Sequence, residues 1–196
     1  MKVFNKKGFA ALAAVALLAA ACGGSTTEGK TLTIGISLPL SGSSLASAGP
    51  ARDGALLAIK ETTIEGYTLA TKILDHAVDG VHNPAQAATD MTTLVGDETV
   101  VAVVGPFNSS SAKAQIPVSS EAGLAACSPS NTNPDLTKGD AGAALRGGRP
   151  VNYVRVAATD DLQGPAVAVY AKSRGKSKVF IVDSTDTYGK GIADSF

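Results

Sequence analysis

Hydrophobic and polar positions along the chain follow two different periods, which predict strands and helices in turn. Residues 31–38 place Leu32, Ile34, Ile36 and Leu38 two apart, as in a strand. Residues 99–104 (TVVAVV) form a continuous apolar run rich in β-branched side chains, typical of a strand buried on both faces of a parallel sheet. Further strands are expected over residues 67–74, 124–127, 152–156 and 178–183.

Helical patterns separate these strands. Pro50 is expected to open a helix over residues 51–61, and Asn83 with Pro84 to cap and open a helix over residues 85–95. Alternating strands and helices build right-handed βαβ units. The sequence therefore predicts an α/β fold with a doubly wound parallel sheet. Further helices are expected up to about Gly123, over residues 162–173, and from Gly189 onward.

The N-terminus has the pattern of a secretory signal peptide. Lys2, Lys6 and Lys7 precede an uninterrupted apolar run over residues 9–21, which is shorter than a membrane-spanning helix requires. We expect residues 1–21 to be a signal peptide.

Cys22 follows that run directly, and this arrangement resembles the bacterial lipobox, in which the cysteine is lipidated. The lipobox prefers leucine three residues before the cysteine, whereas Ala19 stands there in this chain. Plain cleavage that releases a soluble protein is the alternative. We expect lipidation at Cys22, with residues 22–30 as a flexible tether.

Composition argues against nucleic-acid binding and against an intramolecular disulfide. Hydrophobic residues make up 44% and aromatic residues 5%, without tryptophan, so the core must be aliphatic. Without residues 1–21 the chain has a mild acidic excess and no clustered basic face, which argues against a nucleic-acid partner. Cys127 is then the only thiol, and we expect it to be a buried strand residue outside any intramolecular disulfide.

Polar loops follow the predicted strands where open α/β sheets bind ligands, at the carboxyl ends of the strands. Residues 41–49, 105–111 and 128–132 are rich in serine, threonine, asparagine and glycine. Hydroxyl groups and free N–H groups at a helix start suit a carboxylate. The alternative is that Ser109 and Thr132 are only capping and turn residues.

Several stretches resemble the branched-chain amino-acid binding proteins, which have the type I periplasmic-binding fold. The resemblance covers residues 30–196, and its motifs are TIGISLPLSG, ARDGALLAI, VVAVVGPFNSSS, CSPSNTNPDLT, VNYVRVAATDDLQGP and DSTDTYGKGIADSF. It implies two α/β lobes joined by three crossings, with the ligand in the cleft between them. We expect residues 31–155 to form the first lobe, incomplete without a later return of the chain, and residues 156–196 to begin the second lobe of a longer product.

The resemblance also implies a ligand site. One loop would give a serine hydroxyl and backbone contacts to the ligand carboxylate, and the next loop a carbonyl and a threonine hydroxyl to its carboxylate and ammonium. A tyrosine would reach in from the second lobe. The matching residues are Phe107, Asn108, Ser109, Ser130, Asn131, Thr132 and Tyr188. Residues 45–48 lack the aromatic side chain that often packs on the ligand, and the acidic partner of the ammonium is expected beyond Phe196.

The function implied is that of an exported, lipid-anchored or periplasmic binding protein that delivers amino acids or related small molecules to an ABC permease of the inner membrane. Hinge rotation near residues 156–158 would close the lobes on the ligand. A ligand-sensing domain of a receptor or regulator with the same fold is the alternative.

Enzymatic readings have little support. The chain has two histidines, His76 and His82, and no nucleophile–base pair can be assembled from the pattern. Ser110 and Lys113 match Ser-x-x-Lys without its companion motifs. Asp75, His76, Asp79 and His82 spell no closed metal tetrad. We expect no catalytic residue, no metal and no cofactor.

Overall fold

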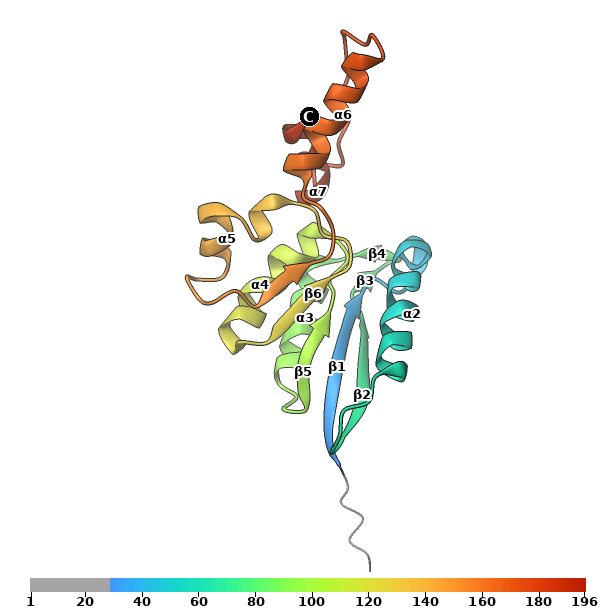
Figure 1. The fold of residues 1–196 in the computed structure, drawn as a ribbon, viewed down its shortest axis with the longest axis vertical. Coiled ribbons are helices and arrows are strands. Elements are labelled where there is room, and N and C mark those ends of the chain that lie inside the picture. Colours follow the sequence, from blue (N-terminus) through green and yellow to red (C-terminus); the bar gives the residue numbers. More distant parts are fainter. Residues whose placement is uncertain (1–28) are drawn as a thin grey trace, which may run out of the picture. The chain divides into compact units, whose positions relative to one another are not determined.

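The structure, a computed structural model, describes residues 29–196 (Figure 1). The predictions of a signal peptide over residues 1–21 and of lipidation at Cys22 lie outside the described residues, as does most of the predicted tether. The division between lobes at residue 155 stays a prediction.

Five strands form the main sheet, in the order β2-β1-β5-β6-β7. β5 pairs in parallel with β1 and with β6, and β6 pairs in parallel with β7. The chain moves from β1 to β2 in one direction and from β5 through β6 to β7 in the other. The strand order therefore reverses between β1 and β5, and the predicted doubly wound sheet is confirmed. The strands are β1 (Lys30–Leu38), β2 (Tyr67–Asp75), β5 (Val100–Val104), β6 (Ala125–Ser128) and β7 (Tyr153–Arg155).

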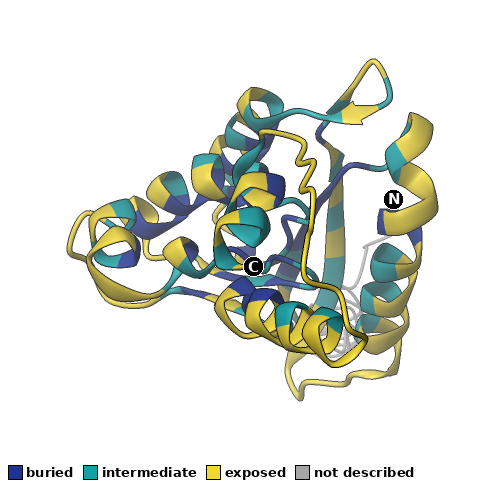
Figure 2. Ribbon diagram, turned by 90° about the horizontal axis from the view of Figure 1, so that it is seen from above, coloured by how far each residue is buried: buried dark blue, intermediate teal, exposed yellow. Residues whose placement is uncertain are grey.

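Helices pack on both faces of this sheet. Neighbouring strand residues point to opposite faces, so Val103 joins a core with Met91 of α3 and Ile116 of α4, while Val104 packs against the core that α2 covers. Figure 2 shows the buried stretches in dark blue. The helices are α2 (Leu45–Glu61), α3 (Pro84–Val95), α4 (Ser109–Ala122), α5 (Gly139–Leu145), α6 (Asp160–Ser173) and α7 (Thr187–Ser195), with short 3-10 turns η2 (Gly42–Ser44) and η3 (Pro134–Leu136).

The start of α2 differs from the prediction. We expected Pro50 to open the helix, but the helix begins at Leu45 and Pro50 lies inside it. Proline in this place forfeits a backbone hydrogen bond to the preceding turn. Ala48 is fully buried with Ile36 and Leu38, and this burial stabilises the extra turn. Residues 41–49 are therefore mostly helical instead of an open binding loop.

The predicted strand over residues 178–183 is wrong. These residues have no regular structure, and Phe180 and Val182 are 91% and 82% exposed. An isolated extended segment gains no ladder hydrogen bonds, and no partner strand lies beside this one within residues 29–196. The local pattern favours a strand, but within the described residues no neighbouring strand pairs with this segment.

A small hairpin was also missed. β3 (Ala77–Val78) and β4 (Val81–His82) pair antiparallel around Asp79 and Gly80, both of which have positive φ. Asp-Gly is a typical sequence signal for such a hairpin turn. Cys127 lies on β6 as predicted, but it is only partly buried.

Candidate ligand-binding site

The loops that follow β5 and β6 lie beside the point where strand order reverses. Gly105, at the start of the first loop, has φ +130°, and a Cβ there would lie 2.2 Å from the Ser37 carbonyl oxygen of β1. Only glycine allows the loop to pass the end of β1 so closely. The loop is thereby placed at the switch point, where open α/β sheets bind ligands.

Hydrogen bonds connect the two loops. The Phe107 carbonyl accepts hydrogen bonds from Asn131 Nδ2 at 2.6 Å and from the Ser130 hydroxyl. The Ser128 hydroxyl donates to the Pro106 carbonyl at 2.7 Å and accepts from the Asn131 N–H at 2.9 Å. Each loop thus fixes the backbone of the other, as a preformed site requires.

A pocket of about 270 Å³ opens between these loops. Six of the seven predicted site residues line it: Phe107, Asn108, Ser109, Ser130, Thr132 and Tyr188. Asn131 is 1% exposed, and its side chain is occupied by the Phe107 carbonyl and the Tyr153 hydroxyl. In the structure the Asn131 side chain therefore connects the loop after β5 to Tyr153 of strand β7 and does not line the pocket.

The start of α4 presents its backbone to this pocket. Asn108 is the N-cap, but its side chain makes no capping hydrogen bond, and Oδ1 is buried without a partner among the described residues. The first backbone bond of the helix is from Ala112 N–H to the Asn108 carbonyl, so the N–H groups of the first turn are left for other acceptors. With Ser109 beside them, they form an end of the pocket that favours an anion.

Asp160 was missed by the sequence analysis. It is fully buried at the start of α6, and within residues 29–196 neither carboxylate oxygen has a hydrogen-bond partner. Its N–H donates to the Thr132 carbonyl at 2.9 Å, which places it directly behind the pocket wall. Burial raises the pKa of Asp160, and the nearby Thr132 hydroxyl and Arg155 guanidinium oppose that rise only in part.

An unpaired carboxylate in such a place suits a cation. Arg155 does not supply the pairing, because its guanidinium donates to the Asn133 carbonyl at 2.6 Å and to the Thr137 hydroxyl. The buried side of α6 carries Asp160 and Gly164, one turn apart. That spacing is a weak signal by itself, because acidic residues also occur at helix starts as exposed charges. The expectation of an acidic partner beyond Phe196 stays a prediction.

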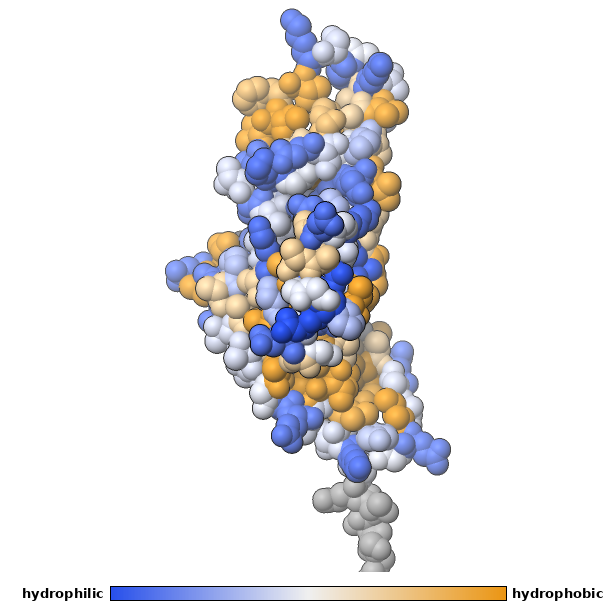
Figure 3. All heavy atoms as spheres, turned by 90° about the vertical axis from the view of Figure 1, so that its left-hand side faces the viewer, coloured by the Kyte–Doolittle hydropathy of each residue, from blue (hydrophilic) through white to orange (hydrophobic). Residues whose placement is uncertain are grey.

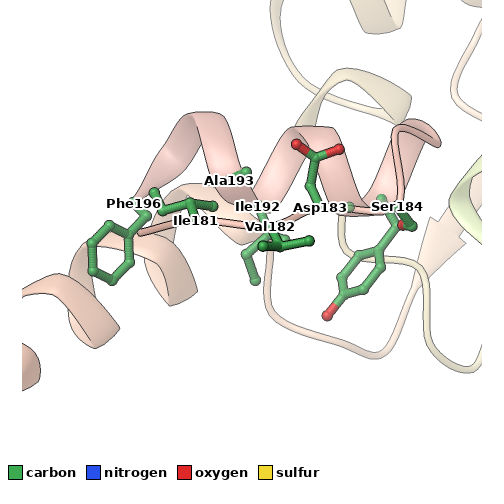
Figure 4. A pocket seen from close by; sticks show the side chains of 9 residues that line it. Ile181, Val182, Asp183, Ser184, Ile192, Ala193 and Phe196 are labelled. Carbon is green, nitrogen blue, oxygen red and sulfur yellow. The ribbon is translucent and has the colours of Figure 1, made fainter. Parts of the chain in front are cut away.

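Tyr188 is placed by α7. Asp186 caps this helix by accepting the Gly189 N–H at 2.7 Å, and Tyr188, 42% exposed, lies in the first turn. The same tyrosine borders a second pocket of about 300 Å³ between α7 and residues 181–184, lined mostly by hydrophobic side chains (Figure 4). That pocket has only two hydroxyl-bearing residues, Ser184 and Tyr188, among mainly apolar side chains.

A buried polar cluster supports α4 from behind. The Ser37 hydroxyl accepts a hydrogen bond from Gln115 Nε2 at 2.8 Å, donates to Asp90 at 3.2 Å and lies 3.1 Å from His76 Nδ1. Burial lowers the pKa of His76 to about 4 and raises the pKa of Asp90. The cluster joins β1, α3 and α4 and keeps His76 neutral at physiological pH.

The side chains weighed as metal ligands have other partners. Asp75 accepts hydrogen bonds from the N–H groups of Leu40 and Ala77, and His82 Nε2 lies 3.1 Å from the Ser110 hydroxyl. Within the described range, no three histidine, cysteine or acidic side chains are grouped as a metal ion would need. The helices described there are also too short or too polar to cross a membrane.

Known proteins show the same sequence pattern and fold. A profile of the family described as periplasmic binding protein matches residues 31–196. The Leu/Ile/Val-binding protein BraC3 of Rhizobium johnstonii is 34% identical over 84% of this chain and 42% of its own length. An amino acid binding protein of Pseudomonas aeruginosa is 31% identical over 99% of this chain and 49% of its own length.

Solved structures agree. The branched-chain amino acid transporter substrate binding protein LivJ of Streptococcus pneumoniae, in complex with isoleucine, is 30% identical with a TM-score of 0.68, over 85% of this chain and 46% of that one. The leucine binding protein LivK of Thermotoga maritima is 26% identical with a TM-score of 0.71, over 84% of this chain and 44% of that one.

The chain spans about half the length of the relatives it matches. These relatives are named for binding and not for catalysis. The predicted resemblance and the type I periplasmic-binding fold are confirmed. The chain belongs to the periplasmic binding protein family.

Proposed function

We propose that the chain forms one side of a binding site for a small zwitterion, an amino acid of the branched-chain type or a close relative. The ligand carboxylate would bind the Ser109 hydroxyl and the N–H groups at the start of α4. The ligand ammonium would lie toward Thr132 and Asp160. Tyr188 would close the pocket from the side of α7.

The unpaired carboxylate of Asp160 carries this proposal. An ionised carboxylate buried without a partner is costly, and a bound ammonium would remove much of that cost. The anion-favouring start of α4 lines the same pocket as Thr132, which contacts Asp160 through its backbone. The start of α4 therefore favours an anion, whereas Asp160, which lies behind Thr132 and does not itself line the pocket, favours a cation. A zwitterion combines both charges. The isoleucine bound by the related LivJ is consistent with this class of ligand.

The cellular role extends the proposal. Family membership implies an exported, periplasmic protein. We propose anchoring through lipid on Cys22 and delivery of the ligand to an ABC permease of the inner membrane. Labelling cells with radioactive palmitate should mark the wild-type protein and leave Cys22→Ser unlabelled. Equal labelling of both proteins, or of neither, would contradict the anchor.

The Asp160→Asn variant tests the site. Titration calorimetry with leucine or isoleucine should show a loss of affinity of about 10-fold or more, because the neutral amide gives the ammonium no counter-charge. Asp161→Asn is the matched control, since Asp161 is the next residue and pairs with Lys138 at 2.8 Å on the surface. That variant should bind as the wild type does.

Ligand analogues test the same point from the other side. The wild-type chain should bind leucine more tightly than its deaminated acid or its decarboxylated amine. The proposed arrangement of charges is wrong if Asp160→Asn binds leucine as tightly as the wild type does. It is also wrong if the wild type binds the deaminated acid and the decarboxylated amine as tightly as leucine.

A further inference from the structure

One histidine, not used by the proposed ligand site, lies between the pocket and the start of α7. His82 ends the β3–β4 hairpin, and its Nε2 is 3.1 Å from the hydroxyl of Ser110, the residue after Ser109 in α4. The same nitrogen is 4.0 Å from Asp186 Oδ2. Asp186 is the N-cap of α7 and stands two residues before Tyr188.

The two side chains are largely shielded from water. The His82 side chain is 21% exposed and the Asp186 side chain 27% exposed. The hairpin that carries His82 is placed tightly, because the Ser43 hydroxyl donates to the Gly80 carbonyl at 3.1 Å and a Cβ on Gly42 would lie 2.1 Å from the Gly80 Cα. His82 therefore cannot move far from α4 without moving the hairpin.

We propose that His82, when protonated, forms an ion pair with Asp186 that holds the start of α7, and with it Tyr188, against the ligand loop of α4. In the neutral ring Nε2 can accept the Ser110 O–H. In the charged ring Nε2 carries a hydrogen and donates toward the Ser110 oxygen and Asp186. We call this ion pair the His82–Asp186 bridge. Its two members act as positioning residues for Tyr188.

The two side chains carry opposite charges only when the His82 ring is protonated. The charged and titratable groups around it are few. His76, directly before β3, interacts with it electrostatically. On α4 the contact is the neutral Ser110, with Lys113 one turn further on. On α7 the contact is Asp186, with Lys190 one turn on and paired with Asp194.

A second contact holds the start of α7, and it involves no titratable group. Asn133 Nδ2 donates to the Thr187 carbonyl at 2.8 Å, and a Cβ on Gly191 would lie 2.4 Å from that same nitrogen. The start of α7 is therefore held at two neighbouring residues directly before Tyr188, Asp186 and Thr187. Of these two contacts, only the His82–Asp186 bridge depends on whether the histidine ring is protonated.

A thermal double-mutant cycle on the full chain without ligand tests the bridge. His82→Gln keeps a hydrogen-bonding group for Ser110, and Asp186→Asn keeps the N-cap, so each variant removes mainly a charge. At pH 5.5 each single variant should lower the Tm by about 2–4 °C, and the double variant should fall no further than either one. At pH 8 the same changes should be within about 1 °C. Asp194→Asn, at the other end of α7, is the control and should be neutral at both values.

Ligand affinity then tests the positioning of Tyr188, a consequence that rests on the proposed function. His82→Gln and Asp186→Asn should weaken leucine binding about fivefold relative to the wild type at pH 5.5, and less than twofold at pH 8. Additive Tm losses at pH 5.5, or equal losses at the two pH values, would overturn the bridge. A coupled pair with unchanged affinity would overturn its role in positioning Tyr188. If the wild type binds no amino acid, the proposed function fails, and the thermal cycle still decides whether the bridge exists.

Discussion

Two fully buried titratable side chains, His76 and Asp160, respond to the same cause in opposite directions. Burial disfavours the charged form of each, so the pKa of His76 falls and the pKa of Asp160 rises. His76 has a hydrogen bond to Ser37 and belongs to the framework behind α4. Asp160 has no side-chain partner in the described part of the chain, which is why we assign the ligand ammonium to it.

The His76 pKa predicts a loss of stability in acid. The unfolded imidazole binds a proton below about pH 6.5, whereas the native one stays neutral to about pH 4. The unfolded state therefore binds more protons in this window, and the free energy of unfolding should fall as pH drops through it, by about 2–3 kcal/mol. The raised pKa values of Asp90 and Asp160 have the opposite effect, because the native carboxyl groups bind protons before the unfolded ones do. Both aspartates are present in each variant used to measure the loss, so their effect cancels in the comparison.

Urea unfolding at pH 7 and pH 4.5 measures this loss. The comparison is best made between His82→Gln and the double variant His82→Gln/His76→Gln, so that His82 is absent from both proteins. The double variant should lose about 2 kcal/mol less on acidification. Equal losses in the two proteins would show that His76 is not the cause.

At the level of elements, two asparagines stand at helix starts and make different contacts. Asn83 Oδ1 accepts the Gln86 N–H at 2.9 Å and so caps α3, whereas Asn108 makes no capping bond on α4. Asn83→Ala should therefore lower the free energy of unfolding by about 1 kcal/mol, and Asn108→Ala by clearly less. Urea titration of both variants checks this, and equal losses would mean that the start of α4 is capped after all.

Local signals account for the elements that the sequence predicted well. Asn83 and Pro84 specify the start of α3 by themselves, and the apolar run of β5 needs no distant residue to be recognised. The segment over residues 178–183 shows the opposite case, because a strand forms only beside another strand. α2 differs for a similar reason, since the burial of Ala48 depends on Ile36 and Leu38 of β1.

Some residues of the candidate site could likewise be predicted from the sequence, and others could not. The general rule for open α/β sheets places the loops after β5 and β6 together, and both lie at one pocket. Asp160 was not predictable from local pattern, because its burial depends on the approach of α7. A Cβ on Gly164 would lie 2.6 Å from the backbone of Ser195, and a Cβ on Gly191 would lie 3.9 Å from Asp160 Oδ2.

In the molecule as a whole, polar chemistry and exposed apolar surface occupy different regions. The pocket is bordered by serine, threonine and asparagine side chains. The stretch that holds α6, α7 and the segment between them exposes hydrophobic side chains, which gather in the upper part of Figure 3. The proposed ligand contacts involve the pocket and Asp160 behind it, and none of those exposed apolar side chains except Tyr188.

The amide NMR spectrum of the ¹⁵N-labelled chain, titrated with isoleucine, shows whether the ligand binds between the loops that follow β5 and β6. Saturable shifts should appear at the N–H groups of Ser109, Ser110 and Thr132, because the ligand carboxylate and ammonium are assigned to that pocket. Shifts confined to other parts of the chain, or none at these three amides at saturating ligand, would contradict the assignment of the pocket.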